Sequence, residues 1–316
     1  MSGLLDRHRW AWPEAMFWGA WIAVFFLFPD RLSLSTQILI WSMFALSLDL
    51  VMGFCGILSL GQAFFFGVGA YATAWTALLG WHEPISAALV GAAVAALAAL
   101  PLGLLVLGLS GLRQIMATLA IGALGLEAAN RAAGVTGGDD GLQGFGFAPL
   151  LGHFRWSIFG QTSFFYALTG FALVFLLLRH LLAAPFGITL QGIRDNATRM
   201  RMLGVRVGRY RLLAWTIGAA IAGLAGALGA QTTRFVGLDS MSLDASIAVL
   251  VMLVVGGTGR LYGGPIGAAV YMIVHDQAAN WNPYHWMAAI GVLLILVVRL
   301  GRGGLLGLME QAWARF

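Results

Sequence analysis

The chain has 316 residues, of which 60% are hydrophobic and only 10% are charged, and its formal net charge is +5. All 18 basic residues are arginines, and they gather in a few short stretches between long apolar segments. This composition is typical of a helical membrane protein and excludes a soluble globular fold, while membrane orientation explains the arginines better than a nucleic-acid partner does.

About ten apolar stretches, each bounded by Gly, Pro or charged residues, are candidate membrane-spanning helices. They cover residues 15–28, 36–52, 62–79, 84–108, 113–131, 162–182, 210–231, 243–255, 263–279 and 286–298. An even number of crossings returns the chain to the side on which it began. We therefore predict an all-α polytopic membrane protein in which residues 1–316 form a single transmembrane domain with both termini on one side.

The distribution of arginines predicts which side is cytoplasmic, because cytoplasmic loops retain positive charge. Arginines occur near both termini and above all between residues 194 and 211. The opposite loops carry fewer of them and several acidic groups, among them Asp139. We therefore expect both termini to be cytoplasmic, together with a cytoplasmic segment at residues 185–209, and we expect a Gly-rich loop at residues 132–161 to face outward.

Ionisable residues inside predicted spans are candidate pathway groups, because each of them is costly on a lipid-facing surface. Glu127, Asn130 and Arg131 stand at helical spacing near the outer end of the fifth stretch, which suits either a structural ion pair or a pathway lining. We expect Asp49 to form an interfacial cap or an inter-helix hydrogen bond rather than to line a pathway. Asp276, at the outer end of the ninth stretch, is expected to be solvated.

Two glycine patterns with the same spacing interrupt the apolar stretches, Gly53, Gly56 and Gly61 in one case and Gly256, Gly259 and Gly264 in the other. Paired glycine-interrupted segments mark a transport pathway in several carriers, whereas chance is the alternative in a chain with 43 glycines. The outward loop is interpreted either as a lid or docking loop, or as an ordinary connector. The candidate pathway or gating residues are Gly61, Gln62, Glu127, Asn130, Thr136, Gly137, Gly138, Asp139 and Gly141.

The charged insert between the sixth and seventh stretches has a helical pattern, but it is too polar to cross a bilayer. Its apolar positions are Leu190, Ile193, Ala197, Met200 and Gly204, and its polar positions are Gln191, Arg194, Asp195, Thr198 and Arg201. We therefore predict one amphipathic helix over residues 187–205. Such a helix lies on anionic lipid or docks into a groove of a cytosolic partner, and the internal Asp195, Asn196 and Gly204 favour the protein contact.

Several segments carry a family resemblance. Residues 184–196 (APFGITLQGIRDN), 203–205 and 210–215 resemble the coupling segment of LivM-type permeases, the membrane subunits of branched-chain amino acid ABC importers. Residues 49–71, 116–122, 136–141 (TGGDDG), 222–228 and 256–268 resemble further segments of that family, in the same order. The resemblance thus extends over most of the chain.

This resemblance implies a type II ABC importer-like permease of a bacterial inner (plasma) membrane, with branched-chain or related hydrophobic amino acids as its substrates. The implied partners are a homologous LivH-type permease in a heterodimer, two cytosolic ABC ATPases, a periplasmic substrate-binding protein and membrane lipid. The sequence contains no lysine and therefore no Walker loop, so this chain is not expected to hydrolyse ATP. No cofactor is expected on it, and ATP and Mg²⁺ belong to the partner ATPases.

Within the insert, the resemblance implies contact with the ATPases through Gly187, Gly192, Arg194, Asp195, Asn196, Arg199, Arg201 and Gly204. Family members carry acidic and small residues just after the Arg-Asp-Asn motif. This chain instead has Ala197, Thr198, Arg199, Met200 and Arg201 at those positions. Its coupling segment is bulkier and more basic, so we expect the groove of its ATPase to be more acidic.

Two other classes of protein compete with this interpretation. A secondary transporter of small zwitterionic or carboxylate solutes, driven by an ion gradient, would carry paired carboxylates or histidines deep in the bundle and would not need the amphipathic insert. An intramembrane enzyme would need a convergent nucleophile or a metal-binding motif, and the sequence contains neither. The lone Cys55 is expected to be a packing residue. We therefore predict a transporter subunit rather than an enzyme.

Overall fold

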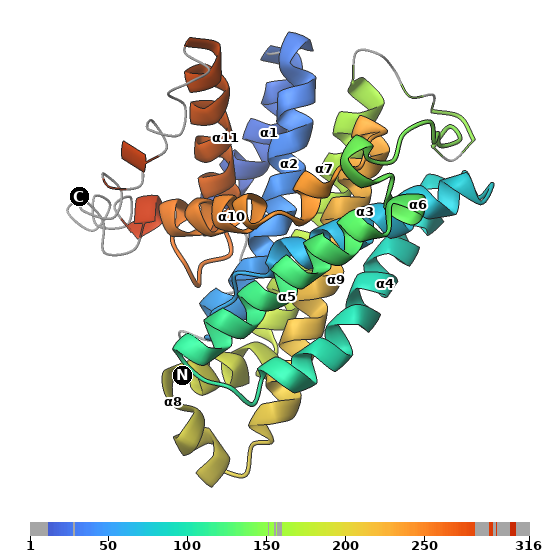
Figure 1. Ribbon diagram of the computed structural model, residues 1–316. Coiled ribbons are helices and arrows are strands. Elements are labelled where there is room, and N and C mark those ends of the chain that lie inside the picture. Colours follow the sequence, from blue (N-terminus) through green and yellow to red (C-terminus); the bar gives the residue numbers. More distant parts are fainter. Residues whose placement is uncertain are drawn as a thin grey trace.

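The computed structural model describes residues 12–27, 29–150, 152–154, 156, 160–281, 291–292, 295 and 304–307, and its regular structure there is helical (Figure 1). The long helices are α1 (Trp12–Leu27), α2 (Leu32–Leu48), α3 (Gln62–Leu78), α4 (Pro84–Val106), α5 (Leu112–Arg131), α7 (Gln161–Ala183), α8 (Pro185–Met202), α9 (Val207–Thr233), α10 (Leu243–Gly256) and α11 (Gly263–Trp281). The short helical pieces are η3 (Pro29–Arg31), η4 (Asp49–Phe54), α6 (Ala133–Thr136), η5 (Gly138–Asp140) and η6 (Leu238–Met241).

These helices coincide with the first nine predicted apolar stretches to within a few residues. The second stretch was placed too short, because its helix continues through the π-helical turn η4. The tenth predicted stretch, residues 286–298, lies outside the described residues apart from 291–292 and 295. Five helical segments of the described chain are long and apolar enough to cross a membrane, namely Pro29–Phe54, Pro84–Val106, Leu112–Arg131, Gln161–Ala183 and Val207–Thr233.

Burial separates central helices from peripheral ones. In the most apolar window of the segment that contains α2, 83% of the residues are buried, and the corresponding value for α9 is 61%. The values for α4 and α5 are 28% and 17%. On α4, the side chains of Leu89, Leu97 and Leu104 are 61%, 65% and 72% exposed, and their spacing puts them on one face. An apolar face of this kind suits contact with lipid.

Small residues let α3, α4 and α9 approach one another closely. A Cβ atom at Gly69 of α3 would overlap the backbone of Gly223 in α9, and a Cβ at Gly91 of α4 would overlap the Thr73 hydroxyl of α3. Gly226 of α9 likewise faces the carbonyl of Phe66. In lipid, where packing rather than hydrophobicity drives helix association, such contacts hold a bundle together. The close approach of α3, α4 and α9 therefore depends on the small residues at their contacts.

The two segments singled out from the sequence lie at opposite ends of the bundle. Helix α8 protrudes at one end, while the loop between α6 and α7 covers part of the other end (Figure 1). The described residues 304–307 return to the start of α11, since a Cβ at Gly304 would contact the backbone of Gly257. The end of α11, at Trp281, is therefore separated from Gly304 by the length of that helix.

Candidate functional site

Helix α8 is not the single continuous helix that its apolar pattern predicted. Its backbone is extended at Asn196, with φ −158° and ψ 94°, so that two helical pieces meet there. The Asn196 side chain caps the second piece, because its Oδ1 atom accepts a hydrogen bond of 2.9 Å from the backbone N–H of Arg199. Asparagine is a favoured residue for such a cap, and this interruption corrects the prediction for residues 187–205.

Glycines define both ends of α8. A Cβ at Gly187 would overlap the backbone of Leu182, so glycine is required at the sharp corner between α7 and α8. At the other end Gly204 has a φ of +82°, and the backbone N–H of Val205 bonds to the carbonyl of Met200 at 3.1 Å. This is the Schellman arrangement, in which the left-handed residue is usually glycine. Gly187 and Gly204, two of the three predicted coupling glycines, thus have a structural reason.

The first half of α8 packs on the bundle, and the second half presents arginines to the surroundings. Leu190 and Ile193 are 0% and 1% exposed, so they anchor the helix. Arg199 and Arg201 are exposed. The Asp195 side chain is 70% exposed and lies 3.3 Å from the Nε atom of Arg194. We call the exposed side chains of Asp195, Arg199 and Arg201 the coupling surface.

Arg194 links α8 to the rest of the bundle. Its Nη1 atom donates a hydrogen bond of 2.6 Å to the carbonyl of Gly53 in η4. One step further in, Oδ1 of Asp49 accepts a hydrogen bond of 2.7 Å from the backbone N–H of Gly259, in the turn between α10 and α11. We call Asp49, Gly53, Arg194 and Gly259 the coupling junction. It joins α8 to α2 and to the α10–α11 turn, and it confirms the inter-helix hydrogen bond expected of Asp49.

The coupling junction can form because Gly53 and Gly259 have no side chains. A Cβ at Gly53 would overlap Oδ1 of Asp49, and a Cβ at Gly259 would lie 2.9 Å from Nη1 of Arg194. Gly259 also has a φ of +73°, a conformation that disfavours other residues. The two glycine patterns noted in the sequence therefore meet at this point. Asp49 is 1% exposed and is the one ionisable carboxyl group among the buried residues of the described chain.

Gly61 and Gln62, predicted for the pathway, lie where α2, α3, α5 and α10 converge. Gln62 is 1% exposed, and its Nε2 atom donates a hydrogen bond of 3.3 Å to the hydroxyl of Ser47 in α2. The next N–H, of Ala63, bonds to the hydroxyl of Ser246 in α10 at 3.1 Å. A Cβ at Gly61 would overlap the carbonyl of Thr118 in α5. The arrangement fixes the start of α3, and a pathway role for these residues stays a prediction.

The predicted site residues between Thr136 and Gly141, in the outward loop, form a structured loop. The Thr136 hydroxyl donates to the carbonyl of Ala129 at 2.6 Å. Leu142 and Val236 exchange backbone hydrogen bonds of 2.8 and 3.2 Å, which tie the loop to the segment after α9. Gly137, Gly138 and Gly141 all have positive φ angles, and Asp139 is exposed. The described part of this loop is therefore held in place, as a docking or gating loop requires, although its role remains a prediction.

Glu127 and Arg131 form the ion pair that their spacing allows. The Nε atom of Arg131 lies 2.6 Å from Oε1 of Glu127, and the two side chains are 81% and 53% exposed. Asn130 is exposed beside them. Exposed pairs of this kind contribute little to stability, typically about 0.2–1 kcal/mol. The ion-pair interpretation is confirmed, while a place in the pathway is a prediction that needs a functional test.

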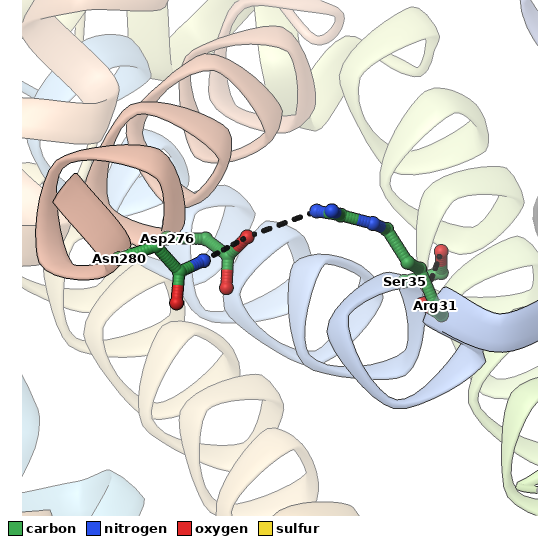
Figure 2. A network of polar contacts seen from close by, with 4 residues as sticks. All are labelled: Arg31, Ser35, Asp276 and Asn280. Carbon is green, nitrogen blue, oxygen red and sulfur yellow. Dashed lines mark hydrogen bonds and ion pairs between the residues drawn. The ribbon is translucent and has the colours of Figure 1, made fainter.

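One polar network was not predicted from the sequence. Nη1 of Arg31, in η3, lies 3.1 Å from Oδ2 of Asp276 on α11, and the Asn280 amide contacts the same oxygen at 3.4 Å (Figure 2). Arg31 and Asp276 also line a largely apolar cavity of about 610 Å³ between α1, α2 and α11. Sequence spacing carries no signal for this pair, because its members are 245 residues apart. Asp276, expected to be solvated, keeps 32% of its side chain exposed and forms an ion pair that was not predicted.

Comparisons with known proteins agree with the sequence patterns. The family model described as "Branched-chain amino acid transport system / permease component" matches residues 31–298. The chain is 28% identical over 305 residues to the high-affinity branched-chain amino acid transport system permease protein LivM of Salmonella typhimurium, covering 87% of this chain and 69% of that protein. It is 27% identical over 173 residues to the probable branched-chain amino acid transport permease protein LivM of Methanocaldococcus jannaschii, covering 50% and 49%.

A permease named for a different transported compound also matches. The autoinducer 2 import system permease protein LsrC of Klebsiella pneumoniae is 31% identical over 142 residues, covering 41% of this chain and 38% of that protein. No solved structure matches the chain. Among the residues that the structure describes, no group of three or more His, Cys, Asp or Glu side chains is arranged to hold a metal ion.

Proposed function

Because the chain belongs to the family of permease components of branched-chain amino acid transport systems, we propose that it is a permease subunit of a binding-protein-dependent ABC importer. Its substrates are branched-chain or related hydrophobic amino acids, in keeping with the names of the LivM relatives. It lies in the bacterial inner membrane and forms the translocation pathway together with a homologous permease.

ATP hydrolysis takes place in two cytosolic ATPases that dock on α8. The coupling surface supports this proposal, because an exposed Asp195 beside exposed arginines offers charged groups to a protein groove. Two short helical pieces that meet at Asn196 make a compact, shaped ridge rather than a straight basic strip. That shape favours a protein partner over a lipid surface.

The single observation that carries the proposal is the hydrogen bond of 2.6 Å between Arg194 and Gly53. A helix that only docked on an ATPase would not need a specific bond to the bundle. Through Gly53 the coupling junction reaches Asp49 and the α10–α11 turn, so a displacement of α8 acts on α2 and α10 together. Packed elements with discrete arrangements transmit such displacements.

A gradient-driven secondary transporter is less well supported. Such a carrier needs ionisable groups that face a pathway deep in the bundle. In the described ranges, Asp49 is the sole buried carboxyl group, and its Oδ1 atom is committed to the backbone of Gly259. The exposed coupling surface would also be left without a use.

Affinity purification tests the assignment of partners. The tagged chain is extracted gently from its native membrane, and mass spectrometry identifies the proteins that remain bound. Recovery of a homologous permease together with ABC ATPases supports the importer, and a co-purified binding protein gives direct access to the ligand. Recovery of the chain alone, or with copies of itself only, contradicts the proposal. An Asn196→Ala variant, which removes the cap inside α8, should recover less ATPase.

A further inference from the structure

Two neighbouring cavities open at the outer end of α2 and α9. One has a volume of about 380 Å³ and lies between α2, the start of α7 and the end of α9. The other has a volume of about 270 Å³ and lies between α2, α3, α9 and the segment that follows α9. Gln37, Thr232 and Thr233 line both of them, so the two cavities adjoin. We call the pair the outer cavity.

One wall of the outer cavity is aromatic. Trp41 of α2 and Phe66 of α3 are stacked, with ring centroids 6.1 Å apart and an interplanar angle of 26°. Both rings line the cavity and are half-buried, so part of each faces it. Gly226 and Gly229 of α9 also line the cavity and pack beside Phe66, since a Cβ atom at Gly226 would overlap the Phe66 carbonyl and one at Gly229 would lie 3.5 Å from the Phe66 ring. The wall suits an aliphatic or aromatic group of modest size.

The charges of the outer cavity have one sign. Asp239 lines the part beside the aromatic wall, and Asp30 lines the adjoining part. Among the described residues of both linings, the only ionisable side chains are these two carboxylates. The hydroxyls of Thr232 and Thr233 are occupied by backbone carbonyls of α9, whereas the Gln37 amide is exposed. A cationic group is therefore the favoured charged part of a ligand.

We propose that the outer cavity is a binding subsite for a small solute that carries an ammonium group and an apolar side chain. The ammonium group binds Asp239, and the side chain packs on Trp41 and Phe66. An α-amino acid meets this description, with its carboxylate turned toward the Gln37 amide and the opening. This inference rests on the proposed function and gives the importer a solute contact within this chain.

The position of the outer cavity supports a role in receiving solute. Its lining includes the end of α9 and the segment that follows it. In the ribbon this end of the bundle also carries the Gly-rich loop, and α8 protrudes at the opposite end (Figure 1). The same segment that contributes Phe235 and Asp239 to its lining is tied to that loop through the Val236–Leu142 bridge. A partner that moves the loop therefore also acts on this wall of the cavity.

Protection of an introduced thiol tests the subsite. In the assembled importer, Thr233→Cys places a thiol on the shared lining, and its rate of reaction with a membrane-impermeant maleimide is measured from outside. The native Cys55 is 0% exposed, and burial raises its pKa to about 12 against a smaller opposing effect of Arg211, so it stays silent. The probes are L-leucine, isoamylamine, which lacks the carboxylate, and isovalerate, which lacks the ammonium group.

L-Leucine and isoamylamine should slow labelling, and isovalerate should not. Asp239→Asn should raise the half-protecting concentration of L-leucine about tenfold, as expected for the loss of a charge-assisted hydrogen bond. Asp140→Asn is the matched control, because it removes an exposed aspartate of the same end that does not line the cavity, and it should leave protection unchanged. Gly229→Leu, which fills the cavity without changing its charge, should abolish protection.

Equal protection by isovalerate, or equal behaviour of Asp239→Asn and Asp140→Asn, overturns the subsite. Uptake by the unmodified importer separates this failure from failure of the proposed function. Normal ATP-driven uptake combined with no protection rejects the subsite alone. Absent ATP-driven uptake by the unmodified complex rejects the importer assignment, whatever the labelling shows.

Discussion

Replacement of Arg194 by alanine should uncouple ATP hydrolysis from transport. The substitution removes the hydrogen bond of 2.6 Å to the Gly53 carbonyl and the contact with Asp195, and it leaves Arg199 and Arg201 in place. A hydrogen bond from a charged donor contributes about 1.5–3 kcal/mol. The Arg194 side chain is 40% exposed, so screening by solvent reduces the expected value to about 1–1.5 kcal/mol. That free energy corresponds to a fall of roughly five- to tenfold in the population of the state in which α8 is held against η4 at the coupling junction.

The assay measures leucine transported per ATP hydrolysed by the complex in proteoliposomes. Arg194→Ala should lower this ratio roughly five- to tenfold while the ATPases remain bound, and Arg194→Lys should restore part of it. Arg206→Ala is the matched control, because Arg206 is an exposed arginine in the turn between α8 and α9. A ratio for Arg194→Ala that equals those of the unmodified protein and Arg206→Ala would refute the reasoning.

Three further outcomes follow from local geometry. Gly204→Ala forces a left-handed backbone on alanine and should weaken recovery of the ATPases, whereas Gly204→Asn should retain most of it; equal recovery of both contradicts the cap. A cysteine at Thr198 should react only from the cytosolic side, and reaction from outside would reverse the orientation. Burial opposes ionisation of Glu83, but hydrogen bonds from Ser86 and from the Ile85 N–H outweigh it and lower its pKa. Since a lowered pKa stabilises the fold above the unfolded value of about 4.5, the difference in melting temperature between the protein and Glu83→Gln should be present at pH 7 and shrink in acid; a difference that is constant with pH contradicts this.

The helical bundle was largely predictable, because the local sequence of each span determines that it forms a helix. Apolar length and glycine or charged borders predicted the long helices α1–α5, α7 and α9–α11, and helical spacing predicted the pair of Glu127 and Arg131. The π-helical turn η4 was missed, since the apolar pattern simply continues to Phe54. The break in α8 was missed for a related reason: apolar periodicity continues across Asn196, and only the backbone reveals the cap.

Contacts between distant segments were not predictable from one sequence. Arg194 donates a hydrogen bond to a backbone carbonyl, a group that every residue carries. The residue types in η4 therefore do not predict this contact. The pair of Arg31 and Asp276 joins positions that each look like ordinary interfacial charges. The outer cavity likewise exists only where Trp41 and Asp239 are brought together by α2 and the segment after α9. Glycine spacing was the one partial signal, because the two patterns meet at Gly53 and Gly259.

The most direct test of the central claim is the energy source of transport. The complete complex is reconstituted in proteoliposomes with ATP on the side of its ATPases, and the binding protein loaded with radiolabelled leucine is added to the opposite side. Accumulation should require ATP, cease with a non-hydrolysable analogue and continue when a protonophore and an ionophore collapse all ion gradients. Accumulation that proceeds without ATP and stops when the gradients collapse would contradict the ABC importer assignment.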